Sequence, residues 1–172
     1  IILKKEEAVG FNGKVGLTTG LGALWVRREN LPGIRPQYRR TPKINPSVSL
    51  NYRKKKFNVF LQVDNLYSQT LNKNEFVTRT YNDQTVINQQ LKRNRNTNFF
   101  TSKAGVDWFI DDRNSLTVSG LFSQETIMDR GDQPFFNENQ SERLRLWQFL
   151  EDEVLTAAMT SIAYEHQFKN PG

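Results

Sequence analysis

The sequence predicts an all-β fold, and more specifically an antiparallel, up-and-down transmembrane β-barrel of which this chain supplies a part, about six strands. Two observations lead to this prediction. Apolar and polar residues alternate with a period of two in several separate segments, and the connections between these segments alternate between short and long. The strands are expected at about residues 13–22, 46–53, 57–80, 99–110, 115–127 and 155–168.

The alternation gives each expected strand one bulky apolar face and one small or polar face. In the second expected strand, Val48, Leu50 and Tyr52 alternate with Ser49 and Asn51. Only the outer surface of a membrane-spanning barrel meets hydrocarbon, so the two faces should meet different surroundings. We expect lipid around Leu50, Val59, Leu61, Val106, Trp108, Val118 and Ile162, and the lumen around Ser49, Gln62, Asp107 and Ser119.

The connections predict which ends of the strands lie together. Residues 54–56 and 111–114 are short and rich in turn-forming polar residues, whereas residues 23–45, 82–98 and the stretch from residue 128 onward are expected to be long loops. Outer-membrane barrels combine short periplasmic turns with long extracellular loops. We therefore expect strands that pair in sequence order, with both short turns at one edge. Residues 141–155 fit either a strand extension or a helical turn around residues 147–153.

The composition excludes several classes of protein. Hydrophobic residues make up 37% of the chain and the mean hydropathy is −0.66, and no stretch approaches the roughly 18–20 apolar residues of a membrane-spanning helix. Cysteine is absent, which excludes disulfides and cysteine-bound metals. The chain shows no N-terminal secretion signal, so we expect it to be an internal part of a longer protein.

The first residues carry a resemblance to a known family. Ile1-Ile2-Leu3-Lys4-Lys5, followed by Gly10-Phe11-Asn12-Gly13-Lys14-Val15, resembles the junction between plug and barrel in TonB-dependent receptors, especially the outer-membrane β-barrel receptors of Bacteroidetes. Residues 49–53, 104–108 and 115–120 are similar to the hairpins of that family. The resemblance covers nearly the whole chain.

The resemblance implies two parts, the end of the plug in residues 1–9 and the N-terminal part of the barrel in residues 10–172. It implies a plugged barrel of about 22 strands in the cell outer membrane. Such receptors bind a nutrient at the cell surface and import it with energy from the TonB complex. The expected partners are outer-membrane lipid, lipopolysaccharide, the rest of the barrel and plug, the TonB complex and an unidentified nutrient, with no nucleic acid and no cofactor.

The basic residues form two groups that could attract anions. The first group falls in the first expected extracellular loop, where solvation is the most frequent explanation and lipopolysaccharide phosphate is a more natural neighbour than nucleic acid. We expect the second group to be solvated as well. The first group is Arg27, Arg28, Arg35, Arg39, Arg40 and Lys43, and the second is Lys92, Arg93 and Arg95.

The acidic residues also invite a functional interpretation. Asp111 and Asp112 with Asp107, or Asp129 with Asp132, could be imagined as metal ligands or an acid/base pair. Turn chemistry explains the first set, and the second lacks the spacing of a calcium loop.

His166 is the only histidine, and Arg130-Gly131-Asp132 matches an adhesion tripeptide of a length that arises readily by chance. We therefore expect no catalytic, metal-binding or cofactor-binding residues and no enzyme, and the ligand-binding residues stay unassigned. Two alternatives remain open: another outer-membrane barrel, such as a passive channel or adhesin, and a soluble all-β ligand-binding domain.

Overall fold

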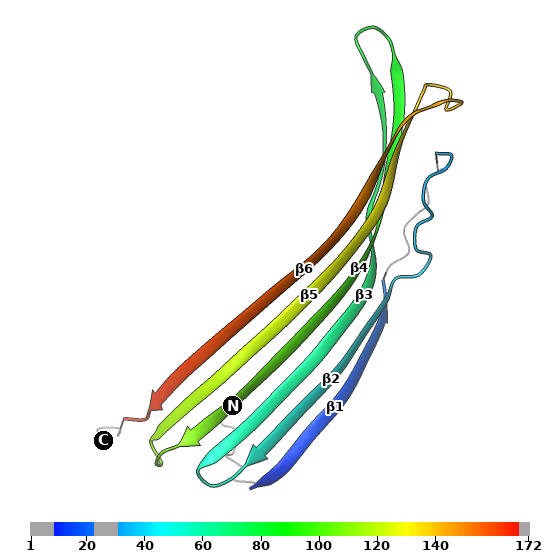
Figure 1. The fold of residues 1–172 in the computed structure, drawn as a ribbon. Helices are drawn as coiled ribbons and strands as arrows, with labels where there is room; N and C mark the ends of the chain where they lie inside the picture. Colours follow the sequence, from blue (N-terminus) through cyan, green and yellow to red (C-terminus); the bar gives the residue numbers. More distant parts are fainter. Residues whose placement is uncertain (1–8, 23–30, 169–172) are drawn as a thin grey trace.

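The computed structural model describes residues 9–22 and 31–168, which form a single antiparallel sheet of six strands in the order β1-β2-β3-β4-β5-β6 (Figure 1). The pairing in sequence order confirms the predicted meander. The short turns at residues 54–56 and 110–113 lie at the same end of the sheet, as expected (Figure 1). The strands are β1 (Gly10–Leu21), β2 (Pro42–Arg53), β3 (Phe57–Thr80), β4 (Val86–Phe109), β5 (Asn114–Phe136) and β6 (Arg143–His166).

The long loops expected at residues 82–98 and from residue 128 onward are wrong. Most of these residues belong to strands, since β3 and β4 have 24 residues each and β5 has 23. The connection between β3 and β4 is only residues 81–85, and that between β5 and β6 is only residues 137–142. The sequence signal failed because both faces of these segments are polar, so no period-two contrast marks them. Backbone pairing continues there regardless of side-chain polarity.

The ambiguous residues 141–155 lie almost entirely in β6, so the strand extension is confirmed and the helical turn is wrong. The other end of the chain also holds more strand than expected, because β1 begins at Gly10 and β2 at Pro42. Pro46 lies inside β2 opposite Leu17, at a point where β2 and β3 have no paired residues. Proline cannot donate to a strand ladder, which explains both the local gap and the underestimated strand.

The register gives the sheet one apolar face. Tyr52, Val59, Val106, Val118 and Ile162 are consecutive cross-strand partners and form one row over five strands. Cross-strand partners point to the same side, so these residues define what we call the apolar face. The seven side chains predicted to share a surface all lie on it.

The opposite side, the polar face, carries the residues that alternate with these. Asn58, Asp107 and Thr117 are cross-strand partners there. The Asp107 carboxylate accepts hydrogen bonds from Asn58 Nδ2 at 2.9 Å and from Thr117 Oγ1 at 2.8 Å. The four residues predicted for the second surface, including Asp107, all lie on this face.

The apolar face is largely uncovered within the described part of the chain. Val59, Val106 and Val118 keep 40–42% of their surface exposed, and Ile162 keeps 71%. Among the described residues, no second layer packs against these side chains. Of the buried hydrophobic residues, Leu91 and Phe136 lie toward the strand ends remote from the short turns, Leu31 lies in the connection between β1 and β2, and Ile127 lies near the middle of β5. A sheet with an exposed apolar face requires something to cover it.

Among the residues that the structure describes, no helix has the length and apolar character needed to cross a membrane.

Candidate functional site

The four longest strands continue well beyond β1 and β2, and this region gathers most of the interacting charges. A β-bulge lies between Leu71 and Lys73 of β3, and Leu71 is aligned through cross-strand pairs with Asn94, Arg130 and Leu150. We call the part of β3 to β6 that begins one residue pair before this level and extends away from the short turns the distal half. It comprises residues 70–80, 86–95, 129–136 and 143–151.

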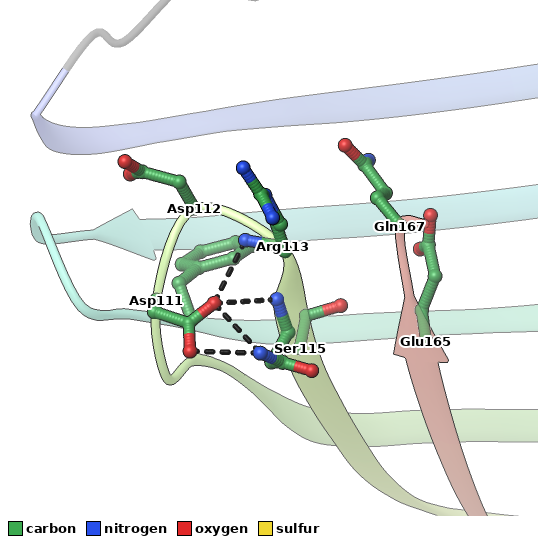
Figure 2. Close-up of a pocket in the computed structure, with 8 residues that line it drawn as sticks. Asp111, Asp112, Arg113, Ser115, Glu165 and Gln167 are labelled. Carbon is green, nitrogen blue, oxygen red and sulfur yellow. Dashed lines mark hydrogen bonds between the residues drawn. The ribbon is translucent and has the colours of Figure 1, made fainter. Parts of the chain in front are cut away.

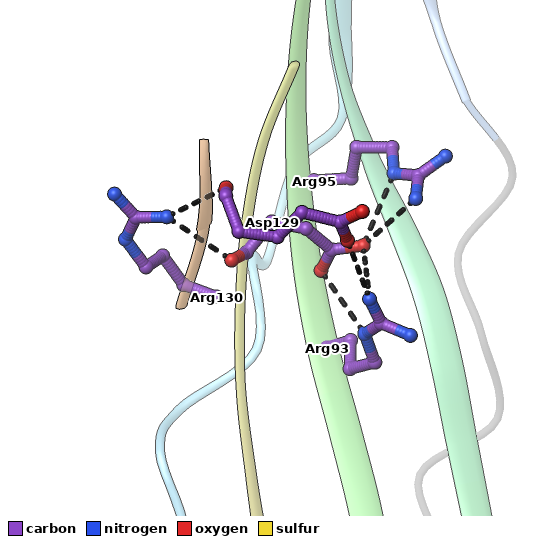
Figure 3. A network of polar contacts seen from close by, with 5 residues as sticks. Arg93, Arg95, Asp129 and Arg130 are labelled. Atoms are coloured by element: carbon purple, nitrogen blue, oxygen red, sulfur yellow. Dashed lines mark hydrogen bonds and ion pairs between the residues drawn. The ribbon is translucent and has the colours of Figure 1, made fainter. Parts of the chain in front are cut away.

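Asp129 is the centre of an ion cluster on the polar face of the distal half (Figure 3). Its side chain is 0% exposed and lies 2.9 Å from Arg93 Nη2 and 3.0 Å from Arg95 Nη2. Arg93 also reaches Glu151 of β6 at 3.0 Å. Arginines two positions apart in a strand share a face, and Asp129 is the direct partner of Arg95. The cluster therefore joins β4, β5 and β6.

Gly131 makes room for this cluster. It is the cross-strand partner of Arg93, and a Cβ atom at Gly131 would lie 2.5 Å from Cγ of Arg93 and 2.7 Å from the Lys92 carbonyl oxygen. Such contacts are too close for any side chain. The glycine of the Arg130-Gly131-Asp132 tripeptide thus has a structural role.

The solvation expected for the second basic group is wrong for two of its members. Lys92 is 4% exposed, and the Arg93 side chain is 15% exposed. A buried arginine needs compensating charge, which Asp129 and Glu151 supply here. Arg130 lies on the other side of the sheet from Arg93 (Figure 3) and pairs with Asp152 at 2.6 Å.

Aromatic and guanidinium groups also gather on the polar face of the distal half. Trp147 is 46% exposed and meets the Phe135 ring edge-on at 5.2 Å between centroids. Arg145 lies over the Trp147 ring at 5.0 Å, and Arg93 lies over Phe149 at 4.8 Å. Exposed aromatic rings beside charged groups are suited to ligand contact. This group was not predicted from the sequence, although the i, i+2 spacing of Arg145, Trp147 and Phe149 is typical of side chains on one face of a strand.

Residues 31–41 form the described part of the connection between β1 and β2, and we call them the strap. Three strand side chains accept hydrogen bonds from backbone nitrogens of the strap and so fix it to the sheet. Gln90 Oε1 accepts a hydrogen bond from Leu31 N at 2.9 Å, and Asn94 Oδ1 accepts one from Tyr38 N at 3.1 Å. Asp132 Oδ2 accepts one from Arg35 N at 2.9 Å. Asn94 Nδ2 also donates to the carbonyl oxygen of Pro36 at 2.9 Å.

Asp129 and Asp132 are therefore not brought together, because the Asp129 side chain lies in the ion cluster on the polar face and the Asp132 side chain bonds the strap on the opposite side of the sheet. Arg27 and Arg28 of the first basic group lie outside the described residues, and so do residues 1–8 of the plug end expected at residues 1–9.

The turn between β4 and β5 borders a shallow hollow of about 160 Å³ (Figure 2). Asp111 Oδ1 accepts hydrogen bonds from the backbone nitrogens of Arg113 at 2.8 Å and Asn114 at 2.9 Å. The Arg113 backbone bond is the main reason why the pKa of Asp111 lies below its ordinary value. Asp112 also lines the hollow, whereas Asp107 is engaged by Asn58 on the polar face. These bonds support turn chemistry for Asp111.

His166 lies at the end of β6, beside the same turn. Its Nδ1 atom is 2.7 Å from Asn114 Oδ1, and its ring meets Phe168 edge-on at 4.7 Å. Within residues 9–22 and 31–168, no group of three or more histidine, aspartate or glutamate side chains is arranged to hold a metal ion. The described contacts of His166 are thus with Asn114 and Phe168, at the end of β6.

Comparison with protein-family models gave no match, and neither did comparison with curated proteins or with solved structures.

Proposed function

We propose that this sheet is part of the wall of a transmembrane β-barrel in the outer membrane of a Gram-negative bacterium, in a TonB-dependent receptor that binds a nutrient at the cell surface and imports it. The observation that carries the membrane proposal is the apolar face, which is continuous over five strands in register and exposed. In an outer-membrane barrel, hydrocarbon covers an apolar outer face of this kind while the polar face lines the lumen.

The dimensions of the apolar face support this proposal. On β3 it extends from Phe57 to Tyr67, a distance of about 33 Å at roughly 3.3 Å per residue. A strand tilt of about 45° reduces this to about 23 Å along the membrane normal, close to the apolar band of roughly 25 Å in outer-membrane barrels. Strands of 23–24 residues exceed the roughly 10 residues needed for crossing, so the distal half projects into the extracellular medium.

The receptor part of the proposal rests on the resemblance at the start of the chain and on the polar face of the distal half. In a closed barrel this face lines the entrance to the lumen. Its exposed groups include Trp147, Arg145 and Glu151, which offer an aromatic surface, a cation and a carboxylate to a ligand.

Six strands are fewer than the eight of the smallest outer-membrane barrels, so the proposal requires further strands to pair with β1 and β6.

Spin labels on neighbouring residues test the membrane proposal directly. The chain has no cysteine, so Val118→Cys and Ser119→Cys give unique attachment sites on opposite faces of β5 once any cysteine elsewhere in the full protein has been replaced by serine. In the full protein reconstituted in lipid, we expect the label at 118 to collide mainly with dissolved oxygen and the label at 119 mainly with a water-soluble nickel chelate. The proposal is wrong if both labels collide mainly with the chelate. A protein that stays monodisperse without detergent supports the soluble alternative.

A second measurement separates a receptor from a passive channel. Energy-coupled import depends on the TonB complex, so uptake through a receptor is expected to stop in cells lacking TonB. Uptake that persists in such cells, together with ion conductance of the purified protein in a planar bilayer, supports a channel.

A further inference from the structure

We propose that the strap binds phosphate groups of lipopolysaccharide in the outer leaflet, through the guanidinium groups of Arg39 and Arg40. This inference rests on the proposed membrane location and adds a site that the barrel proposal does not require. Three observations carry it: the side of the sheet on which the strap lies, its height above the apolar face, and the absence of protein partners for these two arginines in the described part of the chain.

The side of the sheet follows from the register. Gln90 and Asn94, which hold the strap, are separated from Val106 by an even number of residues along β4, and the β4–β5 pairing keeps one register throughout. Their side chains therefore point to the same side as Val106. Asp132 is in the same position relative to Val118 on β5. The strap thus lies on the apolar side of the sheet, the side that meets lipid in the proposed barrel.

The height of the strap matches the headgroup layer. Tyr67, at the distal limit of the apolar face, is the partner of Asn98, and Asn94 lies four residues further along β4. Four residues are about 13 Å along a strand and about 9 Å along the membrane normal at a 45° tilt. Arg39 and Arg40 lie between Tyr38, which is bound to Asn94, and Lys43 of β2, whose partner Ser68 is one residue beyond Tyr67. Their backbone therefore lies between about 2 and 9 Å above the apolar face. Each headgroup layer is roughly 5–8 Å thick.

The charges on this side leave the two arginines available. Arg35 is paired with Asp132 at 3.4 Å, and Arg130 is paired with Asp152 at 2.6 Å. Arg39 and Arg40 are exposed, and within residues 9–22 and 31–168 neither forms an ion pair. Guanidinium groups bind phosphate oxygens in a two-pronged geometry, and a backbone fixed at the preceding residue reduces the entropy lost on binding.

The test compares two charge-matched variants of the full protein, purified in detergent. Arg39→Gln/Arg40→Gln removes two positive charges from the strap. Lys55→Gln/Lys56→Gln removes two exposed positive charges from the turn at the opposite end of the sheet. Affinity is measured for lipopolysaccharide, for the same lipid after enzymatic dephosphorylation, and in competition with inorganic phosphate.

We expect about a fivefold loss of affinity for each arginine, and thus about a 25-fold loss for the strap variant, because one basic residue near an anionic surface contributes about that factor. The turn variant should stay within about twofold of the unmodified protein. Dephosphorylated lipid should bind the unmodified protein as weakly as intact lipid binds the strap variant, and inorganic phosphate should not compete.

Three results would overturn the inference: equal lipopolysaccharide affinity for the strap variant and the unmodified protein, equal losses in both variants, or full competition by inorganic phosphate. The membrane proposal has a separate readout, the heat-modifiable folded band of the unmodified protein in the outer-membrane fraction. If that band is present while the strap variant keeps its affinity, only the phosphate site fails. If the band is absent, the barrel proposal fails and the site fails with it.

Discussion

An arginine placed on each face of one strand gives the sharpest prediction about the sheet. Leu61 and Gln62 are neighbours on β3, and their side chains point to opposite faces. Leu61 pairs with Leu50 and Ala104 on the apolar face, and Gln62 pairs with Ser49 and Lys103 on the polar face. Leu61→Arg and Gln62→Arg therefore introduce the same charge at the same height, and only the face differs.

The surroundings of Leu61 decide the magnitude. Leu61 is 37% exposed within the sheet, and the aliphatic part of an arginine replaces much of its contact, so in water the substitution should cost about 1 kcal/mol or less. In hydrocarbon near the midplane, arginine costs about 2–4 kcal/mol. Gln62→Arg should cost about 1 kcal/mol or less in either environment, mainly through repulsion from Lys103.

The assay is urea unfolding of the full protein in lipid vesicles, followed by the loss of the heat-modifiable band. We expect the midpoint for Leu61→Arg to fall below that for Gln62→Arg, by an amount equivalent to about 1–4 kcal/mol. Equal midpoints for the two variants would refute the assignment of the apolar face to lipid.

The remaining predictions concern the distal half, the packing of the faces and one turn. Asp129→Asn should lower the free energy of unfolding in urea by about 2–4 kcal/mol, because two arginines that are 15% and 33% exposed lose a fully buried partner. Asp152→Asn should lower it by about 1 kcal/mol or less, because the Asp152 carboxylate is 67% exposed. Similar losses in the two variants would contradict the stabilising role of the ion cluster. Gly105→Ala should lower the unfolding temperature more than Gly120→Ala, because an added Cβ would lie 2.5 Å from the nearest atom at 105 and 3.9 Å at 120. The pKa of Asp111 is lowered by hydrogen bonds to its ionised form. The stability that Asp111 adds to the turn should therefore be present at pH values above the ordinary carboxyl pKa and be lost as the pH falls through the lowered pKa. An NMR titration that gives an ordinary pKa for Asp111 would contradict this.

The proximal part of the sheet could be predicted because its pattern is local. Alternation in residues 57–63 and 104–108 assigns Val59 and Val106 to one face without knowledge of their neighbours, and the structure then places them opposite each other. The turn at residues 110–113 was predictable for the same reason, since Asp111 forms its bonds with residues two and three positions away.

The distal half could not be read in this way. Residues 86–95 are mostly polar on both faces, with Val86, Ile87 and Leu91 as exceptions, so no regular alternation distinguishes a paired strand from a loop there. The ion cluster could not be predicted from the sequence either, because Arg95 and Asp129 are 34 residues apart and meet only through the β4–β5 register.

The sequence by itself determined the all-β class, the sequence-order meander, the two faces of the proximal strands and the position of both short turns. The tertiary structure decided how far the strands extend, which charges are buried around Asp129, and where the strap docks, with Leu31 bonded to Gln90 at a separation of 59 residues. The physical reason is that side-chain alternation is set by the backbone of a single strand, whereas the partner of a polar group is set by the register between strands that are distant in the chain.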